Sequence, residues 1–232
     1  MAVHTDIDQP DEYALNEADH KRFADEQARG MLAPQDPRLE LSAAAVDLAQ
    51  IASRQIAGVI DRLYAVAIGQ RRKGREKGRR RTLVGLAAPQ IGEPYRIVLI
   101  DTKVDESRRH YGKLECFVNP VIVWRSRETA EGREGCFSAG PVWGLVRRPV
   151  AVKIRGYNQA GREVTRILED FSARIACHEI DHLNGVRFPE RILSDKKRHW
   201  VHTEELTAYP ELATRWPRLC SLERWQEFKR AG

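Results

Sequence analysis

The residues best suited to chemistry are two histidines four positions apart, His178 and His182, with Glu179 directly after the first. Residues at this spacing lie on one face of a helix, so both imidazoles can bind one metal ion. Glu179 would then lie beside the ion. Phe171 and Ile175 share the same face, so the histidines are expected to point into the core. The alternative is that both are core histidines held by hydrogen bonds.

Two histidines do not complete a catalytic metal site, because such a metal usually has three protein ligands and one open position. A metzincin would carry its third histidine at position 188, where this chain has Phe188, so that class is excluded. A thermolysin-like site would use a downstream glutamate, and Glu204 or Glu205 lies at a tolerable distance along the chain. The third candidate is Cys136, which follows a glycine in a turn-prone segment, although a free cysteine is often only a small buried hydrophobe. Spacing alone leaves the choice open.

The candidate ligands need helices and strands to hold them, and the apolar patterns predict both. Residues 170–183 are predicted to form a helix ending at Asn184-Gly185, a typical C-terminal cap. Residues 42–68 carry apolar residues at helical spacing, with Ser42 as the N-cap. Helices and strands without a regular βαβ alternation predict an α+β fold. Four β-type runs are expected as strands: residues 96–100, 116–124, 150–154 and 163–168.

The composition of the 232-residue chain divides it into a central domain and extensions. Residues 1–28 are polar and acidic and are predicted to be a disordered leader. Residues 29–193 are predicted to be the catalytic domain, with a basic flexible insertion at 70–82. Residues 194–232 form a C-terminal extension that is expected to be partly helical. The acidic start has no apolar stretch like that of a signal peptide, which predicts a cytoplasmic protein.

The net charge of +6 comes from one local run. Residues 71–81 contain eight basic residues and Glu76, so this run carries +7 and the rest of the chain is near −1. The body is therefore not expected to bind DNA specifically, and the run is interpreted as a solvated insertion, with a ribosome contact as the alternative. No apolar stretch is long enough to cross a bilayer, so no membrane partner is expected.

Three segments, in this order, resemble the motifs of the peptide deformylase family. Gly85–Gln90 reads GLAAPQ, Glu134–Ser138 reads EGCFS, and Cys177–Gly185 reads CHEIDHLNG. The similarity covers about residues 29–193, and three motifs in the right order are highly specific. The resemblance implies antiparallel or mixed sheets around a central helix that carries the two histidines, with a helical segment at the C-terminus.

The resemblance also implies a reaction. A metal-dependent hydrolase of this family removes the N-formyl group from N-formylmethionyl peptides of nascent proteins and releases formate. The first alternative is a deformylase-like amidase that acts on another N-acyl peptide or a small N-formyl substrate. Its motivation is that Leu83 and Phe137 stand where the family usually has glycine and leucine. An alternative of another class is a ribosome-associated binding module that uses residues 71–81.

By this resemblance, Cys136, His178 and His182 hold one divalent metal ion per chain. The family implies Fe(II), with zinc, nickel or cobalt able to substitute, since thiolate and imidazole ligands do not choose among them. Glu179 would take a proton from water and deliver it to the leaving amine.

The resemblance further implies how the substrate is held. The Gln90 side-chain amide and the Phe137 backbone N–H would donate to the formyl oxygen as negative charge develops there. The main chain of three residues would pair with an extended peptide as an added strand: Val84, Gly85 and Gly135.

By the same resemblance, Asp181 is expected to lie next to the metal ligands and to help orient them, with Arg148 as its partner. The alternative is a surface salt bridge of little consequence.

Overall fold

The computed structural model describes residues 12–68, 83–106 and 114–231, and it has the predicted α+β architecture. One sheet has five strands in the order β1-β2-β3-β6-β7, and the other has three in the order β4-β5-β8, all antiparallel. The strands are β1 (Gly85–Ala87), β2 (Ile97–Asp101), β3 (Leu114–Arg125), β4 (Thr129–Gly135), β5 (Val142–Pro149), β6 (Ala151–Tyr157), β7 (Glu163–Glu169) and β8 (Arg198–Trp200). The α-helices are α1 (Glu17–Ala28), α2 (Arg54–Ile68), α3 (Asp170–Leu183), α4 (Tyr209–Leu212) and α5 (Leu222–Arg230). Short 3-10 helices lie at Pro37–Glu40, Leu48–Gln50, Ala88–Ile91, Phe137–Ala139, Phe188–Arg191, Asp195–Lys197, Thr203–Thr207 and Ala213–Arg215.

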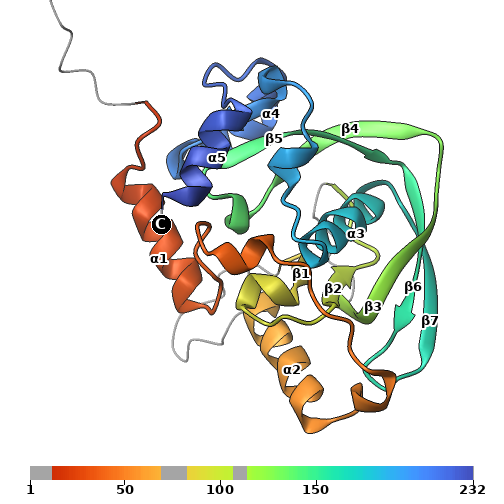
Figure 1. Ribbon diagram of the computed structural model, residues 1–232. Helices are drawn as coiled ribbons and strands as arrows, with labels where there is room; N and C mark the ends of the chain where they lie inside the picture. Colours follow the sequence, from red (N-terminus) through yellow and green to blue (C-terminus); the bar gives the residue numbers. More distant parts are fainter. Residues whose placement is uncertain (1–11, 69–82, 107–113, 232) are drawn as a thin grey trace, which may run out of the picture.

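Helix α3 lies at the centre of the molecule, enclosed by strands of both sheets (Figure 1). Eleven of its 14 residues are buried, because it contacts β1, β2, β6 and β7 of one sheet and β5 of the other. The helix has the predicted bounds, and Gly185 ends it with φ +70°. A Cβ at Gly185 would collide with the Glu40 carbonyl, so only glycine fits there.

The five-stranded sheet is covered by a helix on each face, which explains why β2 is buried along its whole length. Successive side chains of a strand point to opposite faces. Ile97 and Leu99 accordingly pack with α2, whereas Val98 and Ile100 pack with α3. The site helix therefore rests on a sheet that is fixed from both sides.

The four predicted strands are present as β2, β3, β6 and β7, each within two residues of its expected start. Strands β1, β4, β5 and β8 were not predicted. β4 reads TAEGREG and β5 reads VWGLVRRP, so neither is an uninterrupted apolar run. Their registry with each other, from Thr129↔Pro149 to Gly135↔Trp143, forms a ribbon that ends next to Cys136.

The prediction of one helix over residues 42–68 is wrong in its first half. Helix α2 begins at Arg54, and Ser42 forms a β-bridge with Asn184 instead of capping a helix. Leu48 is 54% exposed, so it does not belong to the buried face. The Ser53 hydroxyl accepts from the Ile56 amide and interrupts the pattern, because a serine side chain can bond the backbone at a helix start.

The prediction of a disordered leader is wrong for residues 17–28, which form α1. Asn16 and Asp19 make a reciprocal capping box at its start, each side chain accepting from the other's amide. The helix is polar overall, and its only buried residues are Asp19 and Phe23. Tertiary contacts therefore order a segment whose composition alone predicts disorder.

Residues 70–82, predicted to be a basic insertion, lie outside the described residues. Among the helices that the structure describes, none combines the length and apolar character needed to cross a membrane.

Candidate metal centre and active site

Three side chains from two separate segments bring their ligand atoms together. The donor atoms of Cys136, His178 and His182 all lie within 4.8 Å of one another. The Cys136 sulfur is 3.5 Å from His182 Nε2. The histidines come from successive turns of α3, and the cysteine follows the last residue of β4. Spacing along the sequence left open which residue joins the two histidines, and in the structure the residue next to them is Cys136.

The donor set suits a divalent cation. Burial opposes ionisation of the Cys136 thiol, but the imidazoles of His182 and His178 outweigh it and hold the thiol pKa well below its usual value. Burial likewise opposes charge on His178, yet Cys136 and Glu134 raise its pKa well above the usual value. A thiolate and two imidazoles are ligands that zinc, iron and related metals accept, and a metal bound here would displace the extra proton of His178.

Glu134 fixes the orientation of His178. Its carboxylate lies 2.9 Å from His178 Nδ1, which leaves Nε2 as the nitrogen available to a metal. Arg148 donates two hydrogen bonds to Glu134, at 2.9 and 3.0 Å, and Arg174 donates a third at 3.0 Å. Burial would raise the Glu134 pKa, but the hydrogen bonds from His178 and Arg148 hold it well below the usual range. Glu134 is therefore a fixed anion next to His178.

The predicted pairing of Asp181 with Arg148 is confirmed, at 2.6 Å. Both side chains are buried, so the alternative of an exposed surface ion pair is wrong. Arg191 binds the other side of Asp181, at 2.5 Å. A continuous charge network thus runs from Arg191 through Asp181 and Arg148 to Glu134. Glu134, Arg174 and Arg191 were not predicted to belong to this network.

Glu179 has the opposite environment. Burial raises its pKa to about 8, and its Oε2 atom has no hydrogen-bond partner among the described residues. The carboxylate lies against β1, where a Cβ on Gly85 would collide with it and with Ile175. Gly85 is therefore required by the approach of Glu179. A buried carboxyl with a raised pKa is suited to taking and releasing a proton near neutrality.

Gln90 joins the two halves of the site. Its Oε1 accepts from the Ala87 amide at 2.8 Å, and its Nε2 donates to Cys136 Sγ at 3.3 Å and to Ser138 Oγ at 3.1 Å. The predicted donor thus lies beside the ligand sulfur. Phe137 is the residue directly after Cys136 and begins the 3-10 helix Phe137–Ala139.

Comparison with known proteins agrees with this geometry. Residues 29–198 match the family model described as polypeptide deformylase. The chain belongs to this family. It is 39% identical over 115 residues to a peptide deformylase of Desulforudis audaxviator, covering 50% of this chain and 70% of that protein. It is 37% identical over 134 residues to peptide deformylase 2 of Nostoc sp., covering 57% and 72%.

A solved structure is also similar, that of a class I type b peptide deformylase of Acinetobacter baumannii bound to Met-Ala-Ser. The TM-score is 0.61 at 30% identity, and the match covers 70% of this chain and 96% of that chain. The predicted deformylase fold is confirmed. The chain is a hydrolase of the deformylase type, and the family is one of metalloenzymes.

The thermolysin-like alternative for this deformylase is wrong. Glu204 accepts from Asn16, and Glu205 accepts from the His202 amide and from Arg218. Neither belongs to the ligand cluster found among the described residues. Phe188, at the metzincin ligand position, stacks on His178 with ring centroids 5.9 Å apart.

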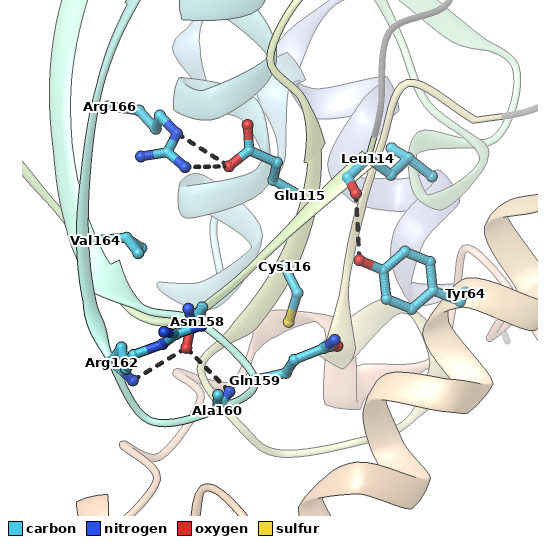
Figure 2. A pocket seen from close by; sticks show the side chains of 10 residues that line it. All are labelled: Tyr64, Leu114, Glu115, Cys116, Asn158, Gln159, Ala160, Arg162, Val164 and Arg166. Carbon is cyan, nitrogen blue, oxygen red and sulfur yellow. Dashed lines mark hydrogen bonds and ion pairs between the residues drawn. The ribbon is translucent and has the colours of Figure 1, made fainter.

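A cavity of about 250 Å³ lies apart from the cluster of Cys136, His178 and His182 (Figure 2). None of the three ligand residues lines it. Arg166 is paired there with Glu115, and Tyr64 donates to the Leu114 carbonyl. Burial raises the pKa of the Cys116 thiol to about 12, so this cysteine is protonated at neutral pH. Cys116 is therefore not poised to act as a nucleophile in this cavity.

Proposed function

We propose that this chain removes the N-formyl group from N-formylmethionyl peptides of newly made proteins in the cytoplasm. The observation that supports this proposal most strongly is the cluster of Cys136, His178 and His182, with Glu179 next to it in a buried site. The related Acinetobacter enzyme with bound Met-Ala-Ser supports a peptide that begins with methionine as the product.

We propose that Cys136, His178 and His182 hold one divalent metal ion, Fe(II) by family resemblance, with zinc, nickel or cobalt able to substitute. When bound, such an ion supplies Lewis acidity, which lowers the pKa of water and polarises the formyl carbonyl. The low pKa of the thiol and the Glu134 contact on His178 support these ligands.

Glu179 is the proposed general base. Its carboxylate takes a proton from the attacking water and later gives it to the nitrogen of the leaving amine, so that formate and a free amino terminus result. The absence of a partner for its Oε2 among the described residues leaves that oxygen available for the proton.

Gln90 Nε2 and the Phe137 backbone N–H are the proposed donors to the formyl oxygen. Gln90 Nε2 lies 3.3 Å from the Cys136 sulfur, and the Phe137 N–H belongs to the residue directly after Cys136, so both donors adjoin this proposed ligand. Loss of one such donor typically costs about 3 kcal/mol of barrier, or roughly a hundredfold in rate.

We propose that the substrate chain pairs with the free edges of two sheets, at Gly85 and Gly135. β1 and β4 are edge strands, which present unpaired main-chain groups. The Val84 carbonyl already accepts from the Asp101 amide at 2.8 Å. Antiparallel pairing alternates, so the next residue, Gly85, directs its main-chain groups to the open edge. Val84 therefore contributes less to the proposed pairing than Gly85.

The test measures bound metal and formate release from formyl-Met-Ala-Ser for wild type, Cys136→Ala and Glu179→Ala. The cysteine variant should lose metal, whereas the glutamate variant should keep metal and lose activity. Acetyl-Met-Ala-Ser serves as the comparison substrate. Turnover of the acetyl peptide without turnover of the formyl peptide would favour the amidase alternative.

A ribosome contact through residues 71–81 is a secondary proposal, supported by the +7 charge of that run. Deletion of the run should reduce co-sedimentation with ribosomes. Unchanged co-sedimentation would contradict this contact and leave the proposed reaction untouched.

A further inference from the structure

The N-terminal and C-terminal parts of the described chain are hydrogen-bonded to each other, and both lie outside the segment that matches the family. The match covers residues 29–198, so α1 and all residues after Arg198 lie outside it. Asp19 of α1 is fully buried and accepts from His202 Nδ1 at 2.6 Å, from the Thr203 amide at 2.8 Å and from the Thr203 hydroxyl at 2.7 Å. Tyr13 donates to the Leu219 carbonyl at 2.9 Å. Figure 1 shows α1 and α5 on the same side of the molecule.

These joined ends also reach the site loop, residues 136–140. The rings of Phe23 and Phe137 meet edge to face, with centroids 5.8 Å apart. At the other end of the loop, Gly140 has φ +62°, and a Cβ there would collide with the ring of Phe228 from α5. Helices from both extensions thus pack on a loop that begins with the ligand Cys136.

A buried arginine links the middle of the same loop to α5. Arg187 donates to the Ser138 carbonyl at 3.0 Å and to the Pro34 carbonyl at 2.6 Å. Its guanidinium carbon lies 4.7 Å from the centre of the Trp225 ring. The loop is therefore held at Phe137, Ser138 and Gly140, and each contact leads to an extension or to a residue that an extension covers.

Only two residues of helix α1 are buried, Asp19 and Phe23. Asp19 fastens it to the C-terminal extension, and Phe23 contacts Phe137 and belongs to the apolar cluster beneath α5. A polar helix that buries so little apolar surface adds little core. The ring of Phe23 reaches the loop of residues 136–140 through its edge-to-face contact with Phe137.

We infer that Phe23 is a positioning residue for the reaction: through the ring of Phe137 it fixes the backbone of residues 136–140, and so the Phe137 N–H and the Cys136 sulfur. This inference rests on the proposed function for its kinetic part, because Phe23 touches no proposed catalytic atom itself. A displacement of about 1 Å in such a group can cost up to a hundredfold in rate.

The experiment compares Phe23→Ala, Phe23→Leu and Leu168→Ala in the full chain loaded with metal. Leu168 is buried on β7 in a different apolar cluster, so its variant reproduces a loss of stability without touching the loop. Two quantities are measured where all variants are folded: hydrogen exchange of the amides of residues 136–140, and kcat and KM for formyl-Met-Ala-Ser.

Phe23→Ala should raise exchange across the loop and lower kcat about tenfold with KM changed less than about threefold. Phe23→Leu should keep loop exchange and kcat closer to the wild-type values than Phe23→Ala does. Leu168→Ala should leave loop exchange and kcat near wild type. Unchanged loop exchange in Phe23→Ala, or an equal change in Leu168→Ala, would overturn the inference. If wild type releases no formate, the proposed function fails, and the exchange comparison still decides the role of Phe23.

Discussion

Two buried glutamates adjoin His178, and their surroundings are opposite. Glu134 receives hydrogen bonds from Arg148 and Arg174 and contacts His178 Nδ1, so its pKa lies well below the usual range despite burial. Glu179 is equally buried, but burial dominates and raises its pKa to about 8. The same residue type is thus a permanent anion in one place and a carboxyl able to gain or lose a proton near neutrality in the other. Partners, not residue type, assign the role.

The largest expected effect is on activity, from Glu179→Gln. The amide keeps the shape of the carboxyl but cannot accept a proton from water, so kcat should fall by about 10²–10⁴-fold. Bound metal and thermal stability should stay near wild type, because Glu179 holds no network together. Formate release, metal content and a melting curve measure the three quantities. Normal turnover would remove Glu179 from the role of base.

Glu134→Gln should give the reverse pattern. Removing this charge leaves Arg148 and Arg174 buried without their shared anion, which typically costs about 3–5 kcal/mol of stability. His178 also loses the carboxylate that orients it, so bound metal should decrease. Denaturant unfolding and metal analysis check this. A variant as stable as wild type, with full metal content, would show that the two glutamates do not differ as described.

The sequence predicted the part of this comparison that follows from local spacing. The two histidines, Glu179 and the bounds of α3 depend on helical periodicity, and the structure agrees with all of them. Cys136 was one of several open candidates until the family motifs were compared. The position of Cys136 beside the histidines depends on the pairing of β4 with β5. Strand β4 has too little apolar alternation to be predicted from the sequence.

The role of Glu134 could not be predicted for a different reason. Its partners Arg148 and Arg174 are 14 and 40 residues away, and no local pattern connects them. The order of α1 was missed similarly, because the buried Asp19 is hydrogen-bonded to His202 and Thr203, more than 180 residues along the chain. Contacts of this kind arise from the tertiary fold alone.

Arg148→Ala tests how far the fixed anion depends on one cation. Glu134 keeps Arg174 and His178, and Asp181 keeps Arg191, so the loss should be smaller than for Glu134→Gln. Metal affinity should fall about 10–100-fold, as is typical when a residue supporting a ligand is removed. Arg191→Ala is the matched control, because Arg191 is half exposed and does not reach Glu134. Equal metal affinity in the two variants would contradict the role given to Arg148.

Asp19 extends the comparison to a third buried carboxylate, and its variant should have the smallest effect. Burial would raise the pKa of Asp19, but hydrogen bonds from His202 and Thr203 outweigh it and hold the pKa below 3.8. A carboxyl with a lowered folded pKa stabilises the protein fully above 3.8, and this contribution is lost as the pH falls through the folded value. Asp19→Asn should therefore lose about 1–3 kcal/mol at pH 7, with the difference from wild type shrinking in acid below pH 3.8.

Asp25→Asn is the control for Asp19→Asn, since Asp25 lies exposed on the same helix and forms an exposed ion pair with Lys21. Urea unfolding across a pH series measures the difference, and the control should stay within a few tenths of a kcal/mol of wild type. A constant difference between Asp19→Asn and wild type down to strongly acidic pH would show that the Asp19 charge does not fasten α1. In that case Asp19 would resemble neither Glu134 nor Glu179, and burial with hydrogen bonds would not be sufficient to make a fixed anion in this fold.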